Sequence, residues 1–157
     1  MKNLLLCALL LSAAPASALI KTKAVEYKHG DVVLQGWAAW EDGFKEKRPG
    51  ILVVHEWWGH GPYARKRAEQ LAKQGYTAFA VDMYGKGVLA KDHDEAGKLA
   101  GAFNSDRLAM RARALAGLAE LKKLPFVDET KIAAIGYCFG GTTVLELARA
   151  GTDLKGV

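Results

Sequence analysis

The chain has 157 residues, of which 50% are hydrophobic and 25% are charged, a composition typical of one soluble globular domain. The formal net charge of +5 is modest. The lysines and arginines are spread over predicted helix faces and loops, without a nucleic-acid-binding motif or interleaved aromatic residues. We therefore interpret them as solvated surface and expect no nucleic-acid partner.

The N-terminus has the pattern of a secretory signal peptide at residues 1–18. Lys2 precedes a short apolar block at residues 4–11, and the small residues Ala16 and Ala18 follow it. We predict cleavage after Ala18 and export of the remaining domain, residues 19–157, to the periplasm or the outside. The apolar block is too short for a bilayer, which needs about 20 residues, so we expect no stable membrane insertion. A buried N-terminal helix is the alternative interpretation.

Cleavage would leave Cys138 as a solitary cysteine, because Cys7 lies inside the signal peptide. Leu6 is not the small residue that is expected before a lipidated cysteine, so we do not interpret Cys7 as an anchor. A single cysteine in an oxidising compartment has no disulfide partner, which favours a role for its reactivity.

The domain is predicted to open with an antiparallel hairpin. Residues 21–27 alternate between the two faces as a half-buried strand does, His29-Gly30-Asp31 forms the turn, and a second strand covers residues 32–40. A charged loop follows at residues 41–50.

A strand, helix and strand follow, and their spacing predicts a right-handed crossover between parallel strands. Residues 51–54 are apolar throughout, as in a strand buried on both faces of a parallel sheet. A helix is predicted at residues 63–74 with Gly75 as its stop, and a second buried strand at residues 76–81.

Two helices are then predicted, a short one at residues 91–102 and a long one at residues 105–124 that Pro125 ends. The apolar spacing of the long helix predicts a buried side formed by Leu108, Ala112, Leu115, Leu118 and Leu121. We expect a further strand at residues 132–135 and the start of another at residues 154–157.

The most informative stretch is Gly136-Tyr137-Cys138-Phe139-Gly140-Gly141, between the strand at 132–135 and a predicted helix at 142–150. So sharp a turn lifts Cys138 out of the sheet edge, and glycines two residues away on each side remove Cβ atoms that would collide. The helix N-terminus favours a thiolate, and its free N–H groups can receive an oxyanion. The pattern indicates a nucleophile for acyl transfer, while a cysteine buried in the core is the alternative.

These segments, at residues 50–59, 81–85 and 135–141, resemble the dienelactone hydrolase family, in particular an exported branch with a signal peptide. The likeness runs from about Lys21 to the last residue. It implies an α/β-hydrolase fold, in which a mostly parallel sheet with an N-terminal antiparallel hairpin is flanked by helices.

The resemblance implies that Cys138 is the nucleophile, that the backbone N–H groups of Trp57 and Phe139 form the oxyanion hole, and that Glu56 meets the thiol in the resting enzyme. Position also favours Glu56, since it ends a parallel strand beside the elbow strand, where such folds bind ligands. A solvated carboxylate is the alternative.

Candidates for the pocket wall are Trp58, Tyr137 and His93, and simple packing stays open for them. His93 falls near the position at which cytosolic members carry a substrate-binding arginine, so dienelactone itself is not implied as the substrate.

The family completes its triad with an Asp and then a His after the nucleophile. The residues after Gly141 include Glu146 and Asp153 but no histidine. We therefore expect this to be the N-terminal part of a longer protein whose C-terminal part is missing, and we expect this part alone to be inactive. The histidines before the elbow are interpreted as loop or pocket residues, not as the base: His55, His60 and His93.

We therefore predict an exported hydrolase of small carboxylic esters or lactones that uses a cysteine nucleophile and needs no metal or organic cofactor. The alternative is a non-catalytic ligand-binding or thiol redox-responsive protein on the same scaffold.

Overall fold

The computed structural model describes residues 19–43 and 45–157, so the predicted signal peptide lies outside the described residues. In chain order the elements are β1 (Ile20–His29), β2 (Val32–Glu41), β3 (Arg48–Val54), α1 (Pro62–Ala72), β4 (Thr77–Val81), α2 (His93–Ser105), α3 (Arg107–Lys122), β5 (Val127–Gly136) and α4 (Phe139–Arg149). Within the described part, none of these helices combines the length and the apolar character that crossing a membrane requires.

The strands form one mixed sheet in the order β1-β2-β4-β3-β5. β1 and β2 form the predicted antiparallel hairpin, and β3 pairs in parallel with both β4 and β5. Val53 in β3 lies opposite Ala80 on one side and Ile135 on the other. The predicted α/β fold and the parallel crossover are confirmed. Because β3, β4 and β5 run in the same direction, their C-terminal ends lie together at one end of the sheet, which we call the site edge.

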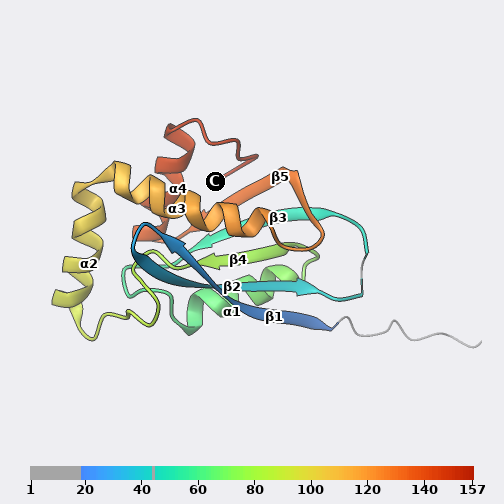
Figure 1. Cartoon of the computed structure of the whole chain (residues 1–157), viewed down its shortest axis with the longest axis horizontal. Helices are drawn as coiled ribbons and strands as arrows, with labels where there is room; N and C mark the ends of the chain where they lie inside the picture. Colours follow the sequence, from blue (N-terminus) through green and yellow to red (C-terminus); the bar gives the residue numbers. More distant parts are fainter. Residues whose placement is uncertain (1–18, 44) are drawn as a thin grey trace, which may run out of the picture.

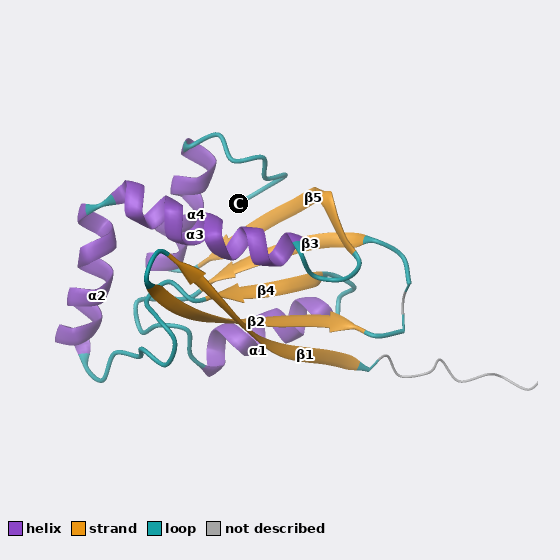
Figure 2. Ribbon diagram, in the orientation of Figure 1, coloured by secondary structure: helices purple, strands orange, loops and turns teal. Residues whose placement is uncertain are grey.

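The helices cover both faces of the sheet. α1 packs against one face, α3 and α4 cover the other, and α2 stands beyond the C-terminal ends of the parallel strands (Figures 1 and 2). Under α1 the core is rich in alanine, and Ala64, Ala68 and Ala72 bring the helix close to the strands. The larger apolar side chains fill the opposite layer, which includes Leu52 and Phe79.

The predicted buried side of α3 is partly wrong. Leu108 is 74% exposed and Leu115 is 41% exposed, whereas Leu118 and Leu121 are buried as predicted. The buried face is centred on Gly117, where an added Cβ would lie 2.1 Å from Cγ2 of Val81. The helix therefore faces the sheet with its smallest residue, because a close crossing over β4 leaves no room for a leucine.

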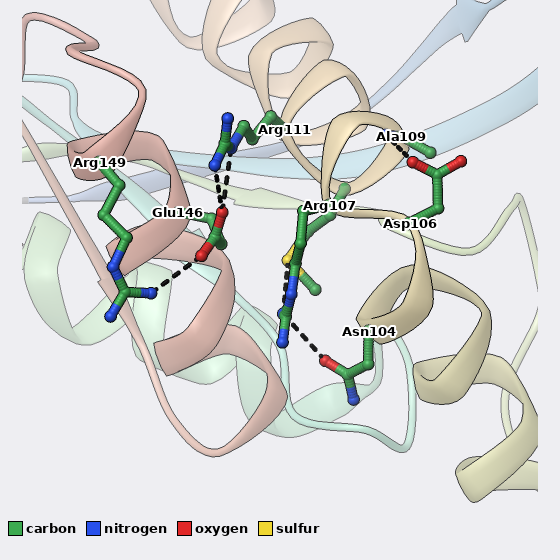
Figure 3. A network of polar contacts seen from close by, with 8 residues as sticks. Asn104, Asp106, Arg107, Ala109, Arg111, Glu146 and Arg149 are labelled. Atoms are coloured by element: carbon green, nitrogen blue, oxygen red, sulfur yellow. Dashed lines mark hydrogen bonds and ion pairs between the residues drawn. The ribbon is translucent and has the colours of Figure 1, made fainter.

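An ion-pair network joins α3 to α4 (Figure 3). The buried carboxylate of Glu146 accepts from Nε and Nη2 of Arg111 at 3.0 and 2.6 Å, and from Nη1 of Arg149 at 2.9 Å. The two charge-assisted bonds from Arg111 hold α4, the helix that follows the elbow, against α3, and Arg149 adds a partner within α4. Beside the network, the Asp106 side chain accepts from the Ala109 N–H at 2.9 Å and so caps the start of α3 (Figure 3).

The last residues lie along the edge of β5. No regular strand forms at residues 154–157, contrary to the expectation, but two backbone bonds reach β5. The Lys155 N–H donates to the Ile132 carbonyl at 2.7 Å, and the Ala134 N–H donates to the Gly156 carbonyl at 3.0 Å. Two such bonds hold the segment at the sheet edge without making a regular ladder.

Candidate functional site

The turn between β5 and α4 has the geometry that the sequence predicts. Cys138 is exposed and occupies the N-cap position of α4, with φ of 53° and ψ of −115°. A Cβ on Gly136 would lie 2.3 Å from the Gly140 carbonyl group, and one on Gly140 would lie 2.4 Å from the Val54 carbonyl oxygen. Both glycines are required because the strand and the helix approach each other this closely.

The loop after β3 reaches the site edge. The pairing of β3 with β5 ends where Val54 lies opposite Gly136. Glu56 and Trp57, which follow β3, therefore lie beside the elbow, which follows β5. Both side chains are half-buried, and Phe139 at the start of α4 is buried. Within residues 19–43 and 45–157, the Glu56 carboxylate and the Cys138 thiol form no hydrogen bond with each other, so the resting contact that the resemblance implies stays a prediction.

His55 joins the ends of two strands. Its Nε2 accepts from the Met83 N–H at 3.2 Å, which leaves the proton on Nδ1, and Nδ1 donates to the Glu56 carbonyl at 2.5 Å. Burial lowers the pKa of His55 to about 4, an effect that the bond to the Glu56 carbonyl partly offsets. Because both ring nitrogens are engaged and the ring is neutral, His55 cannot serve as a proton acceptor at neutral pH.

Tyr84 lies beside this histidine at the end of β4. The ring centroids of Tyr84 and His55 are 4.8 Å apart, and the Tyr84 hydroxyl donates to the Trp57 carbonyl at 3.1 Å. Burial raises the pKa of Tyr84, and the negative charge of a Cys138 thiolate raises it further. The Tyr84 hydroxyl therefore keeps its proton and remains a donor.

Three of the predicted site residues form an aromatic cluster. His93, at the start of α2, lies 5.6 Å from the Trp57 ring and 5.1 Å from the Trp58 ring, and the two indoles are 5.4 Å apart, all in edge-to-face contact. Trp58 and His93 are exposed. The structure thus brings together side chains from the loop after β3 and from α2, which are remote in sequence.

Tyr137 does not join that cluster. Its hydroxyl accepts from Nη2 of Arg67 on α1, and the guanidinium lies 5.4 Å from the centroid of the Tyr137 ring. Tyr63 is edge-on to the same ring at 6.4 Å. These side chains and Glu56 line a cavity of about 10 Å³, too small for more than one water molecule.

Metal ligands do not gather at the site edge. In the described part of the chain, no group of three His, Cys, Asp or Glu side chains is arranged to hold a metal ion. Asp82, which directly follows β4, accepts instead from the backbone N–H groups of Gln35, Tyr84 and Gly85 at 3.0 to 3.1 Å. That carboxylate therefore fixes the loop that carries Tyr84.

The sequence profile of the dienelactone hydrolase family matches residues 34–157, which include the elbow and the loop after β3. The chain belongs to the dienelactone hydrolase family.

Individual relatives agree with this membership. The chain is 32% identical over 134 residues to the protein usf of Aquifex pyrophilus, a match that covers 83% of this chain and 56% of that protein. It is 30% identical over 109 residues to the carboxymethylenebutenolidase of Pseudomonas sp. (strain P51), covering 66% of this chain and 45% of that protein. The chain therefore spans about half the length of these curated relatives.

The fold is also that of solved family members. The crystal structure of a dienelactone hydrolase-like promiscuous phosphotriesterase from metagenomic libraries superposes with a TM-score of 0.81 at 38% identity, covering 86% of this chain and 56% of that one. The overall fold of the described residues is thus that of a dienelactone hydrolase.

Sequence reasoning missed the residues that support this candidate site. His55 was expected only to be a loop or pocket residue, and Tyr84 and Arg67 were not singled out. The available signal was position, since His55 directly follows β3 and Tyr84 follows β4 by three residues. The carboxyl ends of adjacent parallel strands lie side by side, so polar side chains that directly follow these strands are candidates for contact with each other.

Proposed function

We propose that this chain carries the nucleophile and the oxyanion-binding groups of a hydrolase that cleaves small carboxylic esters or lactones. The observation that carries the proposal is the exposed Cys138 at the N-cap of α4, held in a left-handed conformation between two glycines that cannot be replaced without collision. Strained backbone of this kind persists where the surrounding structure enforces it, and it concentrates at active sites.

In the proposed reaction, the Cys138 thiolate attacks the carbonyl carbon of the ester or lactone. The carbonyl oxygen becomes an oxyanion, which accepts hydrogen bonds from the backbone N–H groups of Trp57 and Phe139. The C–O bond then breaks and the alkoxide takes a proton from water; the alcohol leaves when the substrate is an ester and stays tethered to the acyl group when it is a lactone. The hydroxide ion then hydrolyses the thioester, which releases the acid and restores the Cys138 thiolate. The base for these steps is a residue other than His55, because both ring nitrogens of His55 bind backbone groups.

The substrate would enter beside the cluster of Trp57, Trp58 and His93. The exposed rings of Trp58 and His93, at the C-terminal ends of the strands where Cys138 also lies, offer an apolar wall for one substituent of the ester. Glu56, at the site edge, is proposed as the resting partner of the thiol. Membership of a hydrolase family gives no support to the alternative of a non-catalytic or redox-responsive protein.

The proposal is tested by acylation with p-nitrophenyl acetate. In a Cys7→Ser background, we expect a single burst that releases one equivalent of p-nitrophenolate and adds one acetyl group to the intact mass, without the further turnover that hydrolysis of the thioester would give. The Cys138→Ala variant should show neither. Equal acetylation of the parent and of Cys138→Ala would overturn the proposal.

A further inference from the structure

The peptide unit between Glu56 and Trp57 is anchored through its carbonyl. That carbonyl accepts from Nδ1 of His55 at 2.5 Å. The same planar unit carries the Trp57 N–H, which points away from the carbonyl because no cis peptide bond occurs in the described residues. A hydrogen bond that fixes the carbonyl of Glu56 therefore also fixes the direction of the Trp57 N–H.

The next peptide unit is anchored as well. The Tyr84 hydroxyl donates to the Trp57 carbonyl at 3.1 Å, so both carbonyls flanking the Trp57 residue are held. Tyr84 itself is buried, and its ring contacts Phe139 at a centroid distance of 5.5 Å. Residue Trp57 is thus fixed on both sides of its Cα atom.

His55 is in turn held in one orientation and one tautomer. The Met83 N–H donates to Nε2, so Nδ1 must carry the proton that Glu56 accepts. The ring is 3% exposed and stacks on the ring of Phe139 at 5.8 Å. One imidazole therefore touches the residue that follows Cys138 and also orients the peptide that carries the Trp57 N–H.

We propose that His55 and Tyr84 are the positioning residues of the oxyanion hole. They hold the N–H groups of Trp57 and Phe139 at the site edge without touching the substrate themselves. The bond from His55 also polarises the Glu56–Trp57 peptide, since a carbonyl that accepts a hydrogen bond makes its N–H a stronger donor. This inference rests on the proposed function, in which those two N–H groups bind the oxyanion.

Two reactions of the same thiol separate positioning from general reactivity. Acylation by p-nitrophenyl acetate forms an S–C bond, builds an oxyanion on the carbonyl oxygen and expels p-nitrophenolate. Alkylation by iodoacetamide also forms an S–C bond and expels iodide, but builds no oxyanion. The ratio of the two rate constants therefore reports the oxyanion hole and cancels differences in thiolate population.

The variants are Tyr84→Phe and His55→Phe, made in the Cys7→Ser chain. Tyr27→Phe is the matched control, because Tyr27 is also a buried tyrosine whose hydroxyl donates to a backbone carbonyl, that of Asp82 at 3.3 Å. Loss of an oxyanion-hole donor costs about 10² to 10³ in rate, so a misplaced donor should lower the ratio by on the order of tenfold. The control should leave the ratio unchanged.

Each outcome bears on one proposal. If the ratio of acylation to alkylation rate constants in Tyr84→Phe equalled that of the parent and of Tyr27→Phe, the positioning role would be overturned. Cys138 would remain the proposed nucleophile. A parent chain that alkylates but does not acylate would overturn the proposed function instead. If His55→Phe fails to fold, as a melting curve by circular dichroism would reveal, Tyr84→Phe decides alone, since it removes a single oxygen atom.

Discussion

At the scale of single residues, two adjacent glycines of the elbow differ in what surrounds them. A Cβ on Gly140 would lie 2.4 Å from the Val54 carbonyl oxygen and 2.7 Å from that of His55. A Cβ on the neighbouring Gly141 would meet only the Gly136 carbonyl oxygen, at 3.4 Å. Both positions belong to α4, so helix propensity favours alanine equally at each.

We therefore expect Gly140→Ala to destabilise the fold by about 2 to 3 kcal/mol or more, as overpacking against fixed backbone does. Gly141→Ala should cost much less, because the contact is near van der Waals distance and alanine favours the helix. Urea unfolding of the two variants gives the comparison. Equal stabilities would show that the elbow helix can move away from β3.

Because two histidines are buried, we expect the free energy of unfolding to decrease in acid. Burial lowers the pKa of His55 to about 4 and also that of His60 to about 4, where His55 and Arg65 contribute further. Between the ordinary pKa of about 6.5 and the folded value, the unfolded chain binds protons that the folded chain does not. Stability therefore falls as the pH decreases through this window, by on the order of 3 kcal/mol for each histidine.

His60 allows this effect to be measured away from the proposed positioning residues. We expect His60→Asn to lose less stability than the parent when the pH is lowered from 6.5 to 4, because asparagine does not titrate. Unfolding free energies from urea titrations at both pH values check it. If the unfolding free energy of His60→Asn changed with pH as much as that of the parent, His60 would not be buried in its neutral form.

At the scale of elements, the helices are positioned by packing that their own periodicity does not specify. The leucine pattern of α3 predicts a buried face that includes Leu108, yet this side chain is 74% exposed. The close approach of Gly117 to Val81 turns the helix so that Leu121 is fully buried. The ion pair between Arg111 and Glu146 then attaches α4 to the same helix (Figure 3).

These two leucines give a matched pair on one helix. Leu121→Ala should cost about 2 to 5 kcal/mol, the range for a leucine removed from a packed core. Leu108→Ala should change stability by less than about 0.5 kcal/mol, as for an exposed site. Thermal or urea unfolding measures both, and similar costs would mean that Leu108 is covered in solution.

At the scale of the whole molecule, the sheet order collects the site from segments far apart in the chain. β3 lies between β4 and β5, so the loops after all three strands meet at the site edge. Trp57 and Tyr84 are 27 residues apart in sequence, yet they share a hydrogen bond across that edge. α2 adds His93 from beyond the strand ends (Figure 1).

Export is the prediction that concerns the whole molecule. We propose that residues 1–18 direct secretion and are removed, so that the mature protein begins at Leu19. Expression of the intact chain in a Gram-negative host, followed by intact-mass measurement of the periplasmic fraction, checks this. A cytoplasmic protein that retains Met1 or Lys2 would contradict it.

How much could be predicted from the sequence differs between the elements. β5 begins at Val127, five residues before the predicted strand, because Val127 and Asp128 pair with Arg48 and Pro49 of β3. Residues 129–131 have no partner in β3, and the ladder resumes at Ile132 opposite Gly50. The exposed Glu129 and Thr130 in that stretch carry no strand signal of their own. α4 begins at Phe139, three residues earlier than its apolar pattern indicates, since the glycines after Cys138 are already helical.

The sequence by itself determined the order of strands and helices, the sharp turn at Cys138 and the resemblance to the dienelactone hydrolases. These features are local, because a buried strand, a helix and the glycines between them are encoded by neighbouring residues. Only the tertiary structure decided which face of α3 is buried, that Tyr137 pairs with Arg67, and that His55 binds two backbone groups. Such contacts depend on which strands become neighbours and how closely the helices approach them, and neither is encoded within a single segment.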